Sequence, residues 1–386
     1  MSWSPGIDYP PTGGNILNTD YIGKPKSAID TPALLLDAGA VERNLEKMAV
    51  YFAGKDVQLR PHVKLHRATP QLAKKQIAAG AIGCTCAKLS EAEVLAAAGI
   101  NNILIANQMT GGIKMERLGK LAKIVDVMVA VDNPDNVREL SACAQSHAVE
   151  IGVLVEVNIG HNRCGVAPFG PTLELSQLVL KSTGLKFMGL MGYDGHCTLK
   201  ATEEEREDLS LEANKLLVEV RNFLEESGLE VEIVSGSGTF TYRYASQVQG
   251  ITEIQAGTYL LMDTAFREHG VREFDLTLSV LASVTSRPEY PGADGLFIVD
   301  AGRKSISLML GTPEVKHPEG VYVFSLSDEH GRLKTETGGV TPQLGQKVEI
   351  WVRDANYTIS QFDRFYVMRD EVVEDVWKIP LCGINT

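Results

Sequence analysis

Short apolar runs alternate with stretches of helical periodicity along most of this chain. The run at residues 31–37 (TPALLLD) predicts a buried strand, and a helix is expected to follow from Ala38. The apolar face of that helix consists of Val41, Leu45, Met48 and Phe52. Because the same alternation continues to about residue 272, the pattern predicts an α/β fold.

Eight further apolar runs predict strands, and helical stretches separate most of them. These strands are expected at residues 57–60, 82–86, 102–106, 125–131, 150–157, 185–191, 231–234 and 251–255. Ser90 and Glu93 indicate a capping box at one helix start, and Gly80 and Gly99 mark expected helix ends. Eight strands with intervening helices fit a (β/α)8 TIM-type barrel. A doubly wound sheet is the rival, but it would have a glycine-rich turn after its first strand, whereas here that turn follows the seventh.

The pattern changes at about residue 273, where short alternating or β-branched runs begin. They predict strands at residues 277–284, 295–299, 320–326, 346–352, 364–368 and 372–377, separated by turns. This is the signature of an all-β domain. The expected division is an N-terminal arm (1–30), a strand and helix joining the β domain to the barrel (31–55), the barrel (56–272) and the C-terminal β domain (273–386).

Composition and charge exclude several classes of protein. The 386 residues are 44% hydrophobic, which is typical of a globular chain, and no apolar run approaches the roughly 20 residues that span a bilayer. The net charge of −12 disfavours nucleic acid or an anionic membrane as a partner, while leaving room for a local pocket that binds one phosphate. The six cysteines lack the spacing of a zinc site and are expected to be free and buried. We expect a cytoplasmic protein.

Two glycine-rich segments are expected side by side at the carboxyl ends of the last two barrel strands. They are Ser237-Gly238-Thr239, within SGSGT, and Gly257-Thr258-Tyr259. Glycines let the backbone approach a ligand, and successive free N–H groups form a nest for an anion. The alternative is that SGSGT is only a flexible turn. The two segments together favour a phosphate site, which barrels commonly build at this position.

A lysine follows the first barrel strand, within Arg60-Pro61-His62-Val63-Lys64-Leu65-His66. Its amine becomes a nucleophile toward aldehydes when desolvation or nearby cations lower its pKa. A solvated surface lysine is the alternative. Lys64 and a phosphate cradle on one barrel rim together fit pyridoxal 5′-phosphate, with Arg163 at the phenolate oxygen and Tyr193 against the ring.

Three histidines accompany this lysine as candidate catalytic groups. His62 and His66 flank Lys64, and one of them is expected to lower its pKa. His196 is the candidate acid or base, since an imidazole titrates near neutral pH. A structural histidine is the alternative at position 196.

These residues resemble the D-threonine aldolase and D-serine dehydratase family, which are pyridoxal-phosphate enzymes of the alanine-racemase fold (type III). The resemblance rests on the R-P-H-x-K-x-H motif around Lys64, and it covers nearly the whole chain beyond residue 30. It extends to Arg163-Cys164-Gly165, Tyr193-x-Gly195-His196, SGSGT, Gly257-Thr258-Tyr259, Asp300-Ala301-Gly302 and Glu329-His330-Gly331. It implies that Lys64 is the Schiff-base lysine, that the first strand joins the β domain, and that the protein is a homodimer.

One stretch departs from this family. Where the family has a metal-binding H-x-C or H-C-D, this chain has Asp354 and Asn356. The loss of imidazole and thiolate argues against zinc, whereas two oxygen donors are compatible with Mg²⁺ or Mn²⁺. A polar turn or a direct substrate contact without metal is the alternative.

The family's aldolases and dehydratases both act on β-hydroxy D-amino acids, and the protein decides which bond to Cα breaks. Expelling hydroxide depends on a metal more than retro-aldol cleavage does, so the weakened metal motif favours an aldolase-type lyase that releases glycine and an aldehyde. An amino-acid racemase or epimerase, a D-serine or 3-hydroxyaspartate dehydratase, and a non-catalytic cofactor carrier are the alternatives.

Overall fold

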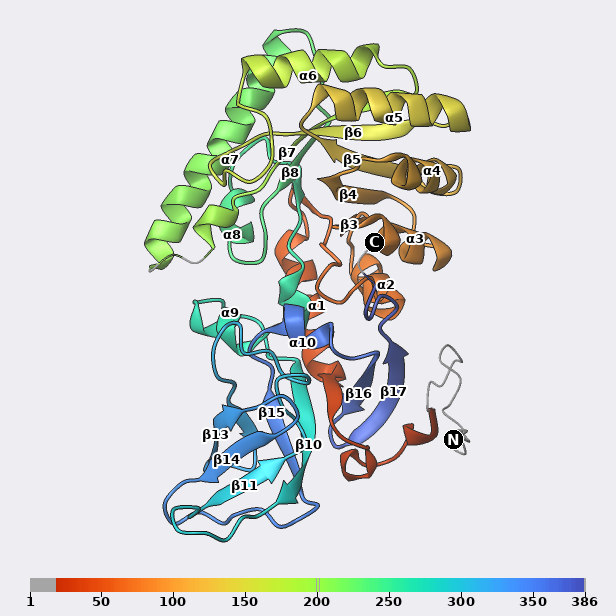
Figure 1. Ribbon diagram of the computed structural model, residues 1–386. Coiled ribbons are helices and arrows are strands. Elements are labelled where there is room, and N and C mark those ends of the chain that lie inside the picture. Colours follow the sequence, from red (N-terminus) through yellow and green to blue (C-terminus); the bar gives the residue numbers. More distant parts are fainter. Residues whose placement is uncertain (1–18, 199, 201, 385–386) are drawn as a thin grey trace, which may run out of the picture.

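The computed structural model describes residues 19–198, 200 and 202–384. It has two parts, a barrel with its helices and a β domain, and helix α1 (Ala38–Phe52) runs between them (Figure 1). Most of the arm expected over residues 1–30 lies outside the described residues. The part of it that is described contains two short 3-10 helices, η1 (Thr19–Tyr21) and η2 (Lys26–Ala28).

Eight parallel strands form the barrel, which confirms the predicted fold class. Their order is β2-β9-β8-β7-β6-β5-β4-β3. The end strands are joined by backbone hydrogen bonds from Val63 to Thr85 (2.8 Å) and from Thr85 to Pro61 (2.9 Å). The strands are β2 (Gln58–Leu59), β3 (Cys84–Cys86), β4 (Ile103–Gln108), β5 (Val127–Val131), β6 (Ile151–Glu156), β7 (Leu185–Gly192), β8 (Ile233–Gly236) and β9 (Glu253–Ile254).

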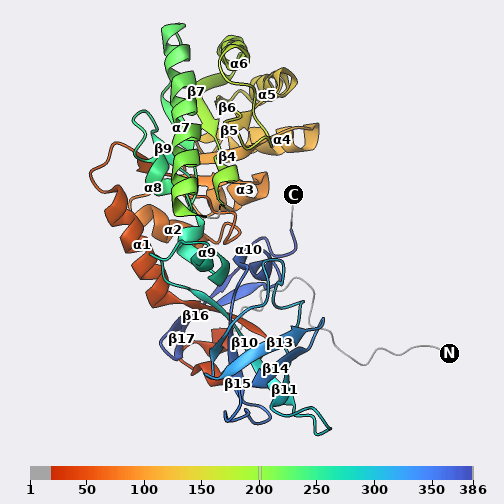
Figure 2. The same ribbon diagram turned by 90° about the vertical axis from the view of Figure 1, so that its left-hand side faces the viewer.

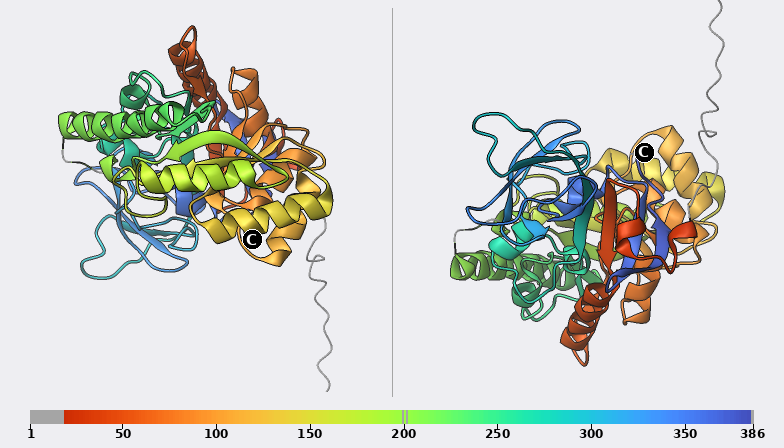
Figure 3. Two further views of the ribbon diagram at one scale, coloured as in Figure 1. Left: turned by 90° about the horizontal axis from the view of Figure 1, so that it is seen from above. Right: turned by 90° about the horizontal axis from the view of Figure 1, so that it is seen from below.

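Helices cover the outside of these strands. Figure 2 shows the long helix α7 in front of the strands, and the views in Figure 3 place α1 on the side opposite α5. No helix in the described ranges is long and apolar enough to cross a membrane. The barrel helices are α2 (Pro70–Ala78), α3 (Leu89–Ala97), α4 (Gly112–Leu121), α5 (Pro134–His147), α6 (Gly170–Lys181), α7 (Glu203–Glu226), α8 (Tyr242–Ala245) and α9 (Thr264–Glu268), with 3-10 turns η3 (Gly195–Cys197) and η4 (Thr258–Leu261).

The β domain is built around the first strand of the chain. Strand β1 pairs antiparallel with β10 and parallel with β16, so the N-terminal segment sits inside a sheet made mostly of C-terminal residues. The order is β13-β14-β11-β10-β1-β16-β17, and β15 pairs with β10 and β12. The elements are β1 (Ala33–Asp37), β10 (Leu278–Ser286), β11 (Leu296–Val299), β12 (Val315–His317), β13 (Val321–Leu326), β14 (Gly331–Thr335), β15 (Lys347–Trp351), α10 (Ala355–Ile359), β16 (Arg364–Arg369) and β17 (Val372–Lys378).

The predicted helix ends are confirmed, but one predicted helix start is wrong. Gly80 and Gly99 follow α2 and α3 with φ of +102° and +80°, a conformation that suits glycine. The capping box expected at Ser90 lies two residues earlier. The Glu91 carboxylate accepts hydrogen bonds from the backbone N–H of Ala87 and Lys88, so α3 begins at Leu89.

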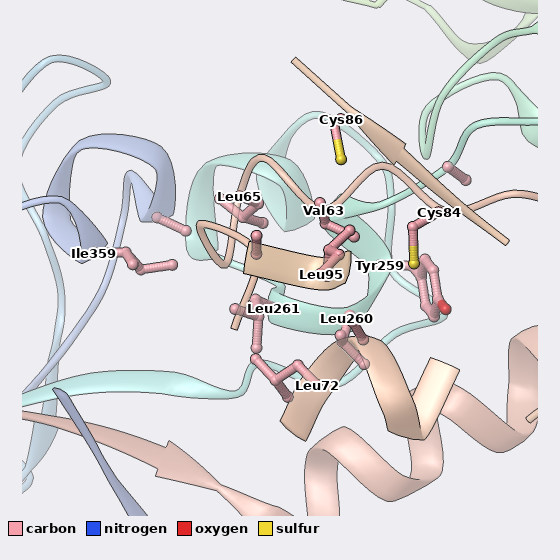
Figure 4. Close-up of a cluster of buried hydrophobic side chains, with 14 of the residues drawn as sticks. Val63, Leu65, Leu72, Cys84, Cys86, Leu95, Tyr259, Leu260, Leu261 and Ile359 are labelled. Atoms are coloured by element: carbon pink, nitrogen blue, oxygen red, sulfur yellow. The ribbon is translucent and has the colours of Figure 1, made fainter. Parts of the chain in front are cut away.

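One apolar core runs from the barrel into the β domain. Figure 4 shows Val63, Leu72 and Tyr259 of the barrel packed in a cluster that also contains Ile359 of α10. All six cysteines are free, as expected, and four of them are buried. The cluster fixes the segment around Val63, which carries the loop after β2.

A buried ion pair fastens the first barrel strand to the last. Arg60 donates from Nη2 and Nε to the two carboxylate oxygens of Glu253, at 2.6 and 2.9 Å, and both side chains are almost fully buried. We expect Arg60→Met to lower the free energy of unfolding by about 3–5 kcal/mol, because it leaves Glu253 charged and unpaired in the interior. Urea unfolding checks this. The double variant Arg60→Met/Glu253→Met is expected to recover much of the loss, and a single variant as stable as wild type would contradict this role.

Candidate active site

A cavity of about 310 Å³ opens at the carboxyl end of the barrel strands, where it is covered by α9 and by Leu310. Its walls come from the loops after β2, β6, β7, β8 and β9. The lining residues include His62, Lys64, Leu65, Ala106, Arg163, Met191, Tyr193, Thr198, Ser237, Gly238, Thr239, Phe240, Gln255, Gly257, Thr258, Ala265, Phe266, His269 and Leu310. Most of the residues predicted from the sequence as cofactor ligands therefore meet in one space.

Lys64 is the lysine of this cavity. Its side chain is exposed at the cavity, and the protein atoms packed close to the amine desolvate it. This desolvation, and after it the positive charge of Arg163, lowers the pKa of the Lys64 amine. A larger share of the amine is therefore neutral at physiological pH, and the neutral form is the one that adds to an aldehyde.

The two histidines that flank Lys64 in the sequence lie in different environments. His62 lines the cavity, and its Nδ1 accepts a hydrogen bond from the backbone N–H of Lys64 at 3.4 Å. Burial, and then the nearby charge of Lys64, lowers the pKa of His62 well below its usual value. His66 is fully buried instead. Its Nδ1 accepts from the Thr69 backbone N–H at 3.0 Å, and its Nε2 lies 3.3 Å from Gln76 Oε1, contacts that favour a structural role.

The buried position of His66 makes stability depend on pH. Burial lowers the pKa of His66 from 6.5 to about 4, so the fold requires the neutral ring. Below pH 6.5 the unfolded chain gains a proton at His66 that the folded chain does not. The free energy of unfolding therefore falls by about 3 kcal/mol as the pH drops from 6.5 to 4. Urea unfolding at pH 7 and pH 4 should show this loss in wild type and a smaller one in His66→Gln. Equal losses in the two proteins would contradict it.

Arg163 and Tyr193 form a second pair at the cavity wall. The guanidinium of Arg163 lies over the Tyr193 ring, 5.1 Å from its centroid. The next residue, Asp194, is buried and accepts hydrogen bonds from Ser210 Oγ (2.8 Å) and Asn214 Nδ2 (3.2 Å), which tie this loop to α7. Arg163 thus has its charge within the cavity, against a Tyr193 ring whose own loop is held by α7.

The loop after β8 has the form of an anion nest. Ser237 adopts a positive φ of 61°, which turns the chain, and its Oγ lies 2.7 Å from Thr241 Oγ1. In the described part of the chain, the backbone N–H groups of Ser237, Thr239 and Phe240 have no protein acceptor. A Cβ at Gly238 would have only Tyr193 Cε2 near it, at 3.8 Å, so the loop faces open space. Unpaired N–H groups beside open space fit a phosphate.

The loop after β9 supports this nest from behind. The Thr239 hydroxyl accepts a hydrogen bond from the Tyr259 backbone N–H at 3.0 Å. A Cβ on Gly257 would lie 2.1 Å from the His62 carbonyl oxygen, so only glycine fits there. Thr258 lines the cavity, but the Tyr259 side chain points into the core, where its hydroxyl accepts from Gln76 Nε2 at 3.2 Å.

His196 follows the Tyr193 loop and is not among the residues that line the cavity. Its ring is stacked with that of His161, with centroids 6.3 Å apart, and its Nδ1 is buried without a partner in the described structure. His161 also packs edge-to-face against Tyr193, at 5.3 Å. The three rings form one cluster next to Arg163.

Asp354 and Asn356 do not meet at the cavity. Asp354 caps α10 and is 1% exposed, whereas Asn356 is exposed to solvent. Both line a second surface depression, which adjoins the cavity at Leu310. Across the described ranges, no cluster of three or more His, Cys, Asp or Glu side chains is arranged to hold a metal ion. The side chains present here therefore do not fit the expected Mg²⁺ or Mn²⁺ site.

Several cavity residues were missed by the sequence analysis. They are Phe266 and His269 of the α9 segment, Phe240 after SGSGT, and Leu310 from the β domain. No motif marks these residues, because they reach the cavity only through the packing of α9 and the β domain over the barrel. The Phe240 and Phe266 rings pack with centroids 4.3 Å apart.

Two family models match the chain in succession. Residues 36–265 match the alanine racemase N-terminal domain, and residues 277–368 match a putative serine dehydratase domain. The first match covers the barrel and the second covers most of the β domain.

Characterised proteins are similar along nearly the whole length. The chain is 36% identical to a D-threonine aldolase of Arthrobacter, over 94% of this chain and 95% of that protein. It is 32% identical to a 3-hydroxy-D-aspartate aldolase of Paracoccus denitrificans, over 94% of each. The crystal structure of D-threonine aldolase from Filomicrobium marinum superposes with a TM-score of 0.88 at 37% identity, covering 94% of this chain and 98% of that one. This chain therefore belongs to the D-threonine aldolase and D-serine dehydratase family of pyridoxal-phosphate enzymes, with the alanine-racemase fold.

Proposed function

We propose that this protein is a pyridoxal-phosphate-dependent lyase that cleaves β-hydroxy D-amino acids to glycine and an aldehyde. The observation that carries the proposal is that Lys64 and the nest of Ser237, Gly238 and Thr239 line one cavity. The identity to aldolases, 36% and 32%, is higher than the 28% and 23% to two dehydratases, which supports this reaction over dehydration.

Each residue of the cavity has a proposed task. Lys64 would hold the cofactor aldehyde, and the nest with Thr258 would bind its phosphate. Arg163 places a positive charge at the phenolate oxygen, and Tyr193, whose pKa is raised by burial, packs as a neutral ring. Bound pyridoxal phosphate would supply an electron sink for the pair left on Cα when a bond breaks.

Other residues of the cavity are proposed to position the cofactor ligands or to exclude water. His62 lies next to Lys64. Because the pKa of His62 is lowered well below its usual value, its ring is neutral and places no positive charge beside the Lys64 amine. Phe240, Phe266 and Leu310 present apolar surface to the substrate end of the cavity. His196, which follows the Tyr193 loop, is proposed as a proton-transfer group that acts next to the cavity wall, since its Nδ1 has no protein partner among the described residues.

Product analysis tests the proposal. The cofactor-loaded protein is incubated with D-threonine, D-serine and D-3-hydroxyaspartate and with their L enantiomers. Glycine and an aldehyde are expected from D substrates alone. Ammonia with a 2-oxo acid would show a dehydratase, and inversion at Cα without cleavage would show a racemase or epimerase.

We further propose that the protein is a cytoplasmic homodimer. The free cysteines are consistent with a reducing compartment, and the dimer is what the family resemblance implies. Sedimentation of the purified protein at micromolar concentration tests the dimer, and a monomer at all concentrations would contradict it.

A further inference from the structure

We propose that His269 binds the β-hydroxyl of the substrate and accepts its proton, and that this protein acts without a metal ion at Asp354 and Asn356. The inference rests on the proposed function, because it names the group that handles the hydroxyl in that reaction. It rests on two observations. The carboxylate of Asp354 is hydrogen-bonded to protein donors, and the His269 ring, just past the end of α9, lines the cavity.

Both carboxylate oxygens of Asp354 are occupied by protein donors. Oδ2 accepts from Ser307 Oγ at 2.7 Å, and Oδ1 accepts from the backbone N–H of Tyr357 at 3.3 Å, which caps α10. The neighbouring Asp263 caps α9 through Phe266 N–H (2.9 Å) and also accepts from Ala355 N–H (2.9 Å). Asp354 therefore holds the start of α10 against Ser307, beside the Asp263 contacts that join α9 to α10.

Asn356 adds no second donor to a metal site. It is exposed, it carries no charge, and it lies with Asp354 in a depression that does not include Lys64 or Arg163. A hard cation is normally held by several oxygen ligands, most of them charged. One occupied carboxylate and one exposed amide do not provide them.

His269 occupies the wall that the substrate would face. Its Nδ1 lies 2.7 Å from the Ala265 carbonyl oxygen, and since a carbonyl can only accept, Nδ1 carries the ring proton. Nε2 is then left as an acceptor. The backbone of His269 is anchored as well, because its carbonyl accepts from Arg206 Nη2 at 2.5 Å.

The other charged groups near this wall are already paired. Glu268 binds Arg353 at 2.5 Å, and Arg267 binds Glu314 at 3.1 Å. Phe266 and Leu310, which also line the cavity, are apolar.

Of the ionisable groups in the cavity, Lys64 and Arg163 are assigned to the cofactor, and His62 Nδ1 accepts a hydrogen bond from the backbone N–H of Lys64. His269 Nε2 can accept a hydroxyl hydrogen here and, unlike the hydroxyl and amide groups that also line the cavity, it can take up the proton.

The proposed step balances as a retro-aldol cleavage. The hydroxyl proton moves to Nε2 of His269, the C–O bond becomes the C=O of the aldehyde, and the Cα–Cβ bond breaks. Its electron pair stays with Cα, where bound pyridoxal phosphate would supply the electron sink. A proton later adds to Cα and gives glycine, and His269 returns its proton to solvent.

The test compares wild type, His269→Gln and a matched control, His317→Gln, which changes an exposed histidine of the β domain. Glutamine retains hydrogen bonding but cannot take up the proton. We expect kcat for cleavage of D-threonine to fall by about 10²-fold or more in His269→Gln alone. Exchange of the Cα hydrogen of glycine in D₂O, which involves no hydroxyl, should stay at the wild-type rate.

Purified wild-type protein tests whether a metal ion is bound or needed. Purified wild type should contain substoichiometric metal, keep its activity in chelator, and show no rise in the Tm of its cofactor-free form with Mn²⁺ or Zn²⁺, since a ligand that binds the folded state raises Tm. Stoichiometric metal that is essential for activity, or unchanged cleavage by His269→Gln, would overturn this inference and leave the proposed function standing. If wild type forms no aldehyde from any β-hydroxy D-amino acid, the proposed function is wrong and the inference falls with it.

Discussion

Lys64→Ala is expected to remove the visible absorbance of the cofactor-loaded protein and to lower kcat/KM for cleavage by about 10⁴-fold or more, the scale seen when a covalent catalytic group is deleted. Lys64 is the lysine that lines the cavity, and its pKa is lowered by its surroundings and by Arg163. No neighbouring amine is placed to replace it in the lining.

The control for this variant is Lys74→Ala, which removes an exposed lysine of α2. It should keep both colour and activity. Borohydride reduction of the loaded wild type, followed by peptide mapping, should locate the cofactor on Lys64. Labelling of another lysine, or a protein that stays colourless with added pyridoxal phosphate, would contradict the assignment.

Gly238→Asp is expected to weaken cofactor binding by about 10²-fold or more while leaving the fold intact. A Cβ at this position meets only Tyr193 Cε2, at 3.8 Å, so the backbone tolerates a side chain. The added carboxylate, however, would lie in the nest where the phosphate is expected, and two negative charges about 4 Å apart repel by several kcal/mol at a partly buried site.

Gly238→Ala is the matched control, because it adds the Cβ without the charge. Cofactor titration of both folded variants separates crowding from repulsion, and circular dichroism verifies the fold. If Gly238→Asp binds the cofactor as tightly as wild type does, SGSGT is only a turn and the phosphate lies elsewhere.

The barrel could be predicted from the sequence because its strands are continuous apolar runs separated by helical periods. Strand β5, fully buried, lies within the predicted run 125–131. The β domain was predicted less completely, because β12 and β14 were missed. In β14 only Gly331 and Leu333 are buried, and Arg332 and Lys334 alternate with them, so the strand resembles a polar turn in sequence.

The site residues were also only partly predictable from the sequence. Lys64, Arg163 and the glycine-rich loops follow strands directly, so their places on the rim follow from local order. The direction of a side chain does not, and His66 and Tyr259 point into the core rather than into the cavity. Phe266 and His269 come to the cavity through tertiary packing of α9, which no local spacing encodes.

The central claim is retro-aldol cleavage of a β-hydroxy D-amino acid, and the most direct test is the product balance from D-threonine. The cofactor-loaded protein is incubated with D-threonine alone, and glycine, acetaldehyde, ammonia, 2-oxobutyrate and inverted threonine are measured together. Glycine and acetaldehyde are expected in equal amounts from the wild type, and neither is expected from Lys64→Ala. Ammonia with 2-oxobutyrate, or inverted threonine without acetaldehyde, would contradict it.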